Sequence, residues 1–183
     1  MDTYEIIAQL IGIVAMAMNI LSFQQKNQRN IIIMQFFGAS LFAVNMFMIG
    51  ATVGGFLNLM GAFRAIVFAN REKFRADKII WVHFFNALYL TSYILTFTVF
   101  GKEPTVVNFI VEFLPIIGMV ATGIGFYLSD AKIIRRLGLV SSPSWLVYNI
   151  YNIAVGGIIC EVLAMFSIVI GMLRHDRNKT DRG

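Results

Sequence analysis

The sequence predicts an all-α, polytopic membrane protein with seven transmembrane helices. Of its 183 residues, 58% are apolar and only 14% are charged, whereas about 25% of the residues of an ordinary soluble domain are charged. The apolar residues fall into runs of about 20, the length that a helix needs to cross the hydrocarbon core of a bilayer. The basic residues gather in every second connection between these runs, as expected for connections on the cytoplasmic side.

The seven spans are expected at residues 4–23, 31–49, 53–70, 79–100, 105–128, 138–153 and 156–173. The first should be a permanent span, because Asp2 and Glu5 stand where a cleavable signal peptide would be basic. Short polar connections separate the next four spans. The sixth is expected to begin late, because Pro143 and the serines around it interrupt its start.

The loop charges predict the orientation of the chain in the membrane. One set of connections, together with the C-terminal tail, carries Lys26, Arg29, Arg71, Lys73, Arg75, Lys78, Lys132, Arg135, Arg136, Arg174, Arg177, Lys179 and Arg182. The other set carries only Lys102, beside Asp2, Glu5 and Glu103. Since basic loops stay in the cytoplasm, we expect the N-terminus outside and the C-terminus inside. The net charge of +5 therefore reflects topology, and we expect no nucleic-acid partner.

An internal repeat explains why the number of spans is odd. Three pairs of segments match in order, namely 11–15 with 117–121, 40–45 with 144–149, and 53–55 with 155–157. Both copies run in the same direction, so they are parallel repeats and need an odd number of spans between them. We therefore expect a three-helix repeat at 1–78, a linker helix at 79–104, a second three-helix repeat at 105–175 and a cytoplasmic tail at 176–183.

This three-plus-one-plus-three layout resembles that of the SWEET sugar transporters and their PQ-loop relatives. In length and layout the chain is similar to the YgjV-like family of small bacterial inner-membrane proteins within that wider group. The resemblance implies a place in the bacterial inner membrane and transport of a small polar solute by alternating access. The proline–glutamine signature is missing, since Pro115 near the start of the second repeat is matched by Gln9 in the first. The hinge of those transporters therefore does not carry over intact.

The resemblance also implies particular binding residues. SWEET-type transporters place an asparagine or a cysteine facing the sugar on the third helix of each repeat, and Asn58 and Cys160 occupy the matching positions here. Vitamin transporters of the PnuC type carry a Trp-x-x-Trp-x-x-x-Asn stripe, to which Trp145, Tyr148 and Asn152 are similar, with tyrosine in place of the second tryptophan. A sugar, a nucleoside or a vitamin-like solute is consistent with these matches.

The residues themselves support a polar site on the sixth span. Trp145, Tyr148, Asn149 and Asn152 lie on one face of a helix. They suit a small polar ligand, because an aromatic ring offers a stacking surface and amides offer donors and acceptors. Packing between helices is the alternative for the same residues. The repeat also matches Asn45 with Asn149, so both amides are expected to reach an axial cavity together with Asn58. Hydrogen bonding between helices is the alternative for each of these three asparagines.

Three charged residues lie inside the predicted spans. Glu112 and Glu161 are expensive to bury in a bilayer and are expected to face a cavity or a partner. Each could carry a proton during transport, or could be a structural group near the outer interface. Arg64 lies near the inner end of the third span, where its side chain is expected to reach the headgroups. A role as a substrate-binding or gating charge is the alternative for this residue.

No catalytic constellation or cofactor site is expected. His83 and His175 are too few for a histidine metal site, and the single Cys160 excludes an internal disulfide. We expect a protein that is not an enzyme and whose partners are the bilayer and a small polar solute, with a homo-oligomer left open. The alternative function is a receptor or scaffold on the same fold that does not conduct.

Overall fold

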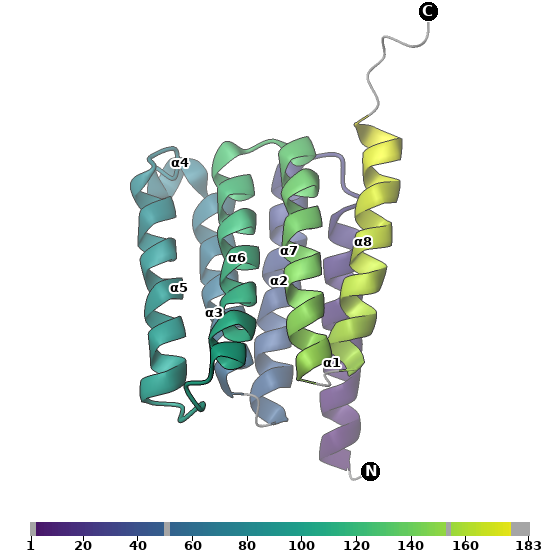
Figure 1. Cartoon of the computed structure of the whole chain (residues 1–183). Coiled ribbons are helices and arrows are strands. Elements are labelled where there is room, and N and C mark those ends of the chain that lie inside the picture. Colours follow the sequence, from purple (N-terminus) through teal and green to yellow (C-terminus); the bar gives the residue numbers. More distant parts are fainter. Residues whose placement is uncertain (1–2, 50–51, 153–154, 177–183) are drawn as a thin grey trace, which may run out of the picture.

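The computed structural model describes residues 3–49, 52–152 and 155–176, and it confirms the prediction of an all-α protein (Figure 1). The described residues contain seven long helices and one short helix: α1 (Thr3–Ser22), α2 (Gln28–Met48), α3 (Thr52–Ala69), α4 (Arg71–Phe74), α5 (Ile80–Thr98), α6 (Val106–Leu128), α7 (Ala131–Tyr151) and α8 (Val155–His175). The long helices stand side by side, and α1 begins at the end of the bundle opposite to the end of α8 (Figure 1).

The helices pack in two sets of three. In the first set α2 lies between α1 and α3, and in the second α7 lies between α6 and α8. The two sets meet where α1 contacts α8, α3 contacts α6 and α2 contacts α7. Helix α5 lies outside both sets and packs mainly on α6, with a smaller contact to α3.

The apolar character of the helices fits a bilayer. By length and composition, α1, α2, α5, α6 and α8 could each cross a membrane, whereas the apolar part of α3 is the shorter segment Gly54–Ala69. Many large apolar side chains are exposed, including Ile6, Leu10, Ile94 and Phe166. Exposed apolar surfaces of this extent are rare in soluble monomers and suit contact with lipid.

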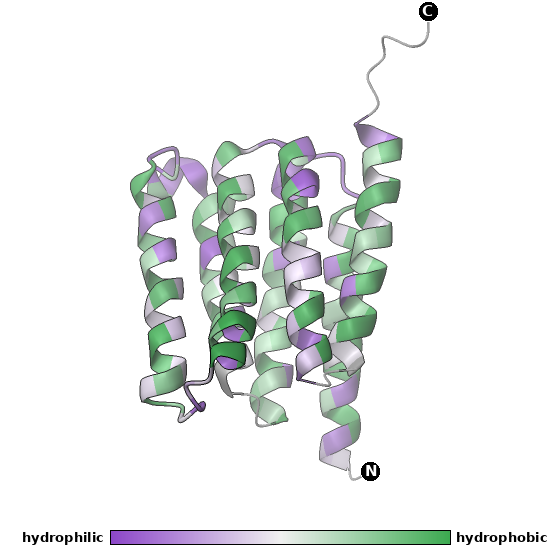
Figure 2. Cartoon of the chain, in the orientation of Figure 1, coloured by the Kyte–Doolittle hydropathy of each residue, from purple (hydrophilic) through white to green (hydrophobic). Residues whose placement is uncertain are grey.

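Basic residues gather at one end of the bundle. The connections from α1 to α2, from α3 to α5 and from α6 to α7 all lie at the end where α8 finishes, and they are strongly polar (Figure 2). We call this end the basic end. Helices α1, α3, α6 and α8 begin at the opposite end (Figure 1).

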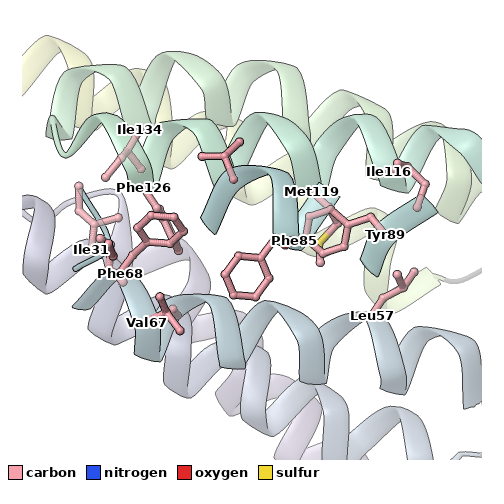
Figure 3. Close-up of a cluster of buried hydrophobic side chains, with 14 residues drawn as sticks. Ile31, Leu57, Val67, Phe68, Phe85, Tyr89, Ile116, Met119, Phe126 and Ile134 are labelled. Carbon is pink, nitrogen blue, oxygen red and sulfur yellow. The ribbon is translucent and has the colours of Figure 1, made fainter. Parts of the chain in front are cut away.

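An aromatic cluster joins α5 to the two sets. Phe85 stacks on Tyr89 along α5 and contacts Phe68 of α3, which in turn meets Phe126 of α6. Figure 3 shows Tyr89 next to Met119 of α6, at the far side of the cluster from Ile31. Buried aromatic pairs of this kind each add about 0.5–1.5 kcal/mol of stability beyond the contribution of the apolar area that they bury. These pairs therefore attach α5 firmly to the two sets of helices.

Polar contacts between the two sets form a clasp at the basic end, made by Gln24, Gln25, Arg135, Ser167 and Asp176. Arg135 is 1% exposed, pairs with Asp176 and donates a hydrogen bond to the carbonyl of Gln25 at 2.9 Å. The amide of Gln24 donates to the hydroxyl of Ser167 at 2.8 Å. The ion pair joins α7 to the end of α8 within the second set, whereas the hydrogen bonds from Arg135 to Gln25 and from Gln24 to Ser167 join the end of α1 to that set.

The predicted start of the sixth span was wrong. Helix α7 begins at Ala131, where Asp130 caps it by accepting a hydrogen bond from the amide of Lys132 at 2.7 Å, and not at residue 138. The helix also continues through Pro143. Serine hydroxyls can bond to carbonyls of their own helix in an apolar bundle, and Ser144 donates to the carbonyl of Val140 at 2.8 Å. The expected loop between the third and fourth spans contains α4, and α2 begins three residues earlier than expected.

Two glycines of α8 provide a matched test of this packing. A Cβ on Gly171 would fall on the carbonyl oxygen of Phe23, whereas a Cβ on Gly156 would meet nothing within 4 Å. We expect Gly171→Ala to destabilise the protein by about 1–3 kcal/mol, the usual range for overpacking, and to lower the Tm by several degrees in a thermal unfolding assay. Gly156→Ala is the control and should leave the Tm unchanged or raise it. Equal Tm values would contradict the close approach of α1 to α8.

Candidate functional site

A polar cavity lies between the two sets of helices. Its volume is about 150 Å³, and its walls come from α1, α2, α3, α6, α7 and α8. Among the described residues of α5, none lines it. The polar side chains of its lining are Asn19, Gln35, Asn58, Arg64, Thr122, Ser141, Ser142, Trp145, Asn149, Cys160 and Glu161.

Five residues that the sequence singled out lie together in this lining: Asn58, Trp145, Asn149, Cys160 and Glu161. They come from α3, α7 and α8, and α3 is far from the other two helices in the chain. The amide of Asn58 donates to the carbonyl of Gly54 in its own helix at 2.9 Å, which leaves its oxygen available to a ligand. The thiol of Cys160 lies 4.0 Å from the amide nitrogen of Asn19.

Three other predicted binding residues lie outside the lining. Asn45 donates to the carbonyl of Ala8 at 2.8 Å, so it joins α2 to α1. Tyr148 lies edge-on to Trp145 with ring centroids 5.8 Å apart and supports that ring from behind. Asn152 is exposed at the end of α7, where it donates to the carbonyl of Tyr148 at 2.9 Å.

The two carboxylates predicted for proton coupling have different surroundings. Glu112 is buried in α6 and forms an ion pair with Lys102 at 3.0 Å, so the charge that the sequence left unexplained has a partner outside the cavity. Glu161 lines the cavity, within hydrogen-bonding range of the hydroxyl of Ser142. The predicted pair therefore does not form a common site.

Arg64 does not reach the headgroups, and that prediction was wrong. Its side chain is only 5% exposed and turns into the bundle. Nη1 donates to the hydroxyl of Tyr89 at 3.0 Å and to the carbonyl of Met119 at 2.8 Å. The guanidinium also lies over the ring of Phe126, with its central carbon 5.0 Å from the ring centroid. Aromatic and carbonyl groups on α5 and α6 therefore hold the charge inside.

Glycines give the site side chains the space that they need. A Cβ on Gly118 would lie 2.9 Å from the ring of Trp145, and a Cβ on Gly157 would lie 2.6 Å from the amide of Asn149. Neither distance is tolerated by a real side chain. Trp145 and Asn149 can occupy the cavity wall because α6 and α8 carry no side chain at these two points.

Several lining residues were not predicted as site residues. Arg64 carried a signal in the sequence, since it is the only charged residue of an otherwise apolar helix, but depth along the helix alone did not reveal which way it turns. Ser141 and Ser142 were interpreted as breaks in a helix. Asn19 and Gln35 gave no signal in one sequence, because their place depends on how α1 and α2 are rotated.

The cavity combines four kinds of chemistry. Amides and hydroxyls supply donors and acceptors, Trp145 supplies an aromatic face, Arg64 supplies a positive charge and Glu161 a carboxylate. A small apolar cavity with a few convergent polar groups is the usual form of a ligand site. The arrangement is suited to binding a small, strongly polar molecule.

Comparison with known proteins identifies a family whose model matches nearly the whole chain. The Imp-YgjV family, described as bacterial inner membrane protein, matches residues 6–179. No curated protein and no solved structure matches the chain. The match extends over the described residues of all eight helices apart from the first residues of α1. The chain therefore belongs to the Imp-YgjV family of bacterial inner membrane proteins.

Proposed function

We propose that the protein transports a small polar solute across the inner membrane by alternating access. The observation that carries this proposal is the polar cavity between the two sets of three helices. A site between two halves that can move against each other is the arrangement that alternating access uses. A purely structural interface would be filled by side chains and would bury fewer polar groups.

The packing of the helices supports two parallel repeats joined by a linker, with seven spans in the membrane. Exchange of α1, α2 and α3 for α6, α7 and α8 turns the contact of α1 with α8 into that of α6 with α3, which is also present. The contact of α2 with α7 maps onto itself. A two-fold axis along the membrane normal produces this pattern, and the layout resembles that of the SWEET group.

The polar contacts between the sets support a state that is closed at the basic end. The clasp lies there, and nearby Arg71 donates to the carbonyl of Tyr127 at 2.7 Å, which joins α4 to the end of α6. At the opposite end, the hydrogen bond from Tyr151 to Asn108 at 3.0 Å lies within one set. Opening of the clasp would expose the cavity to the basic end.

The size of the cavity favours a small solute. At about 150 Å³, it is below the roughly 300–1,000 Å³ of pockets for drug-sized ligands. This size favours a solute smaller than a nucleoside. We propose that the solute is bound without chemical change.

A receptor or scaffold that binds but does not conduct is separated from a transporter by counterflow. Purified protein in liposomes should exchange internal unlabelled solute for external labelled solute, with the solute chosen by a thermal-shift screen. Saturable binding without exchange would favour the receptor.

The loop charges predict the orientation. Green fluorescent protein fused after residue 183 should fluoresce, and alkaline phosphatase fused there should be inactive, because we expect the C-terminus in the cytoplasm. Fusions made after Lys102 should give the opposite pair of results. Active phosphatase at the C-terminus would contradict the proposed topology.

Two asparagines provide a matched test of the site. Asn58 and Asn152 each donate to a carbonyl of their own helix at 2.9 Å, but only Asn58 lines the cavity. We expect Asn58→Ala to weaken solute binding about tenfold, the effect of losing one hydrogen bond of about 1.5 kcal/mol, with no change in Tm beyond that of Asn152→Ala. Isothermal titration of both variants measures the difference. Equal affinities would remove Asn58 from the site.

The single cysteine reports on access to the cavity. Cys160 is buried in the lining, so a bound solute should slow its reaction with a small methanethiosulfonate reagent. We expect saturating solute to lower the rate severalfold, followed by mass spectrometry, and Cys160→Ala to abolish labelling. A rate that does not respond to a solute known to bind would contradict binding in this cavity.

A further inference from the structure

The guanidinium of Arg64 uses only part of its hydrogen-bonding capacity. It has five N–H donors, of which the two on Nη1 bond to Tyr89 and Met119. Among the residues that the structure describes, Nε is buried and has no acceptor, and no carboxylate forms an ion pair with this side chain. Nη2 lies 4.0 Å from the point that a Cβ on Gly61 would occupy, and Gly61 lines the cavity. The free donors therefore lie beside the cavity.

Burying an unpaired cation costs free energy unless a ligand supplies the missing hydrogen bonds and the opposite charge. A guanidinium inside an apolar bundle loses its hydration, and two hydrogen bonds with one aromatic contact replace only part of it. Planar, bidentate groups such as carboxylates match the geometry of the remaining donors. The chemistry of the side chain therefore favours an anionic group in the cavity.

Glu161 supplies the opposite charge on the other side of the same cavity. It belongs to α8, whereas Arg64 belongs to α3. Both helices start at the end opposite the basic end (Figure 1). At 1.5 Å per residue, Glu161 lies roughly 9 Å and Arg64 roughly 18 Å from the start of its helix. In the described residues the two charges form no direct ion pair, so they are separated along the cavity.

We propose that the cavity recognises a small zwitterion, whose anionic group binds Arg64 and whose cationic group binds Glu161. This inference rests on the proposed solute-binding function and names the chemical class of the solute. A carboxylate and an ammonium on one short molecule would neutralise both charges of the lining at once. Trp145 also lines the cavity and can add a cation–π contact to the ammonium. A neutral sugar would leave both charges without a counter-ion.

The volume limits the length of such a molecule. A cavity of about 150 Å³ is comparable to an engineered protein cavity that binds benzene, a molecule of six heavy atoms. An amino acid of three to five carbon atoms is of this size. The separation of the two charges favours an ω-amino acid over one whose two charged groups share a carbon atom.

Matched probes test the proposal on the full-length protein in lipid nanodiscs. The zwitterions are glycine, β-alanine, 4-aminobutanoate and 5-aminopentanoate. The controls are propanoate, which carries only the anion, propylamine, which carries only the cation, and glucose, which carries neither. Isothermal titration is expected to show that the best zwitterion binds about 10- to 100-fold more tightly than propanoate or propylamine, because each lacks one charge-assisted hydrogen-bonded group.

Variants of two glutamates identify the residue that binds the cationic group of the zwitterion. Glu161→Gln should abolish the preference for the zwitterion over propanoate while propanoate still binds, because Arg64 is unchanged. Glu112→Gln is the matched control, since Glu112 is also buried in a long helix but pairs with Lys102 outside the cavity. It should keep the full preference. Arg64→Lys retains the charge without the planar fork, so it should weaken both zwitterion and propanoate.

The outcomes separate this inference from the proposed function. If glucose binds and undergoes counterflow while no zwitterion does, the assignment of a zwitterion is overturned and the transport function stands. A zwitterion preference that persists in Glu161→Gln also overturns it. If no probe binds and none undergoes counterflow, both the zwitterion assignment and the proposed function are rejected.

Discussion

The burial of Arg64 is the constraint on which much of the bundle depends. A guanidinium inside an apolar bundle must have acceptors and aromatic faces around it, and two neighbouring helices supply them. Tyr89 brings α5 into this arrangement, and Met119 and Phe126 bring α6. The contacts of Arg64 therefore fix α3, α5 and α6 together at the wall of the cavity.

The rest of the bundle is held at a different place. The clasp joins α1 to α7 and α8 at the basic end, around the buried Arg135. Between these two points the sets of helices meet mainly across the cavity. The contacts around Arg64 are rigid, whereas the polar contacts of the clasp can be exchanged for water when the bundle opens. This difference is compatible with one set of helices rocking against the other.

Much of the fold could be predicted from hydropathy and charge, because these set which segments can lie in a bilayer. The boundaries of the helices were harder to predict. The charges of Lys132 and Arg135 suggested a loop, although Asp130 caps a helix that begins before them. Repeat matching placed Asn58 and Cys160 in a cavity, and both line the one described above, but it also placed Asn45 there, which instead bonds to α1. The rotation of a helix decides such positions, as it does for Arg64, and one sequence does not reveal which neighbour a polar side chain meets.

The two ionisable groups of the lining would give the cavity an electrical direction. Under the repeat match proposed above, which aligns Asn58 with Cys160, the counterpart of Arg64 is Phe166 and the counterpart of Glu161 is Leu59. Each of the two groups therefore has no equivalent in the other set of helices. An assembly of two identical three-helix subunits would carry each group twice or lack it, so its cavity would have no electrical polarity. A single polypeptide can keep a different group in each set, and its fifth helix, α5, also supplies the tyrosine that bonds to the arginine.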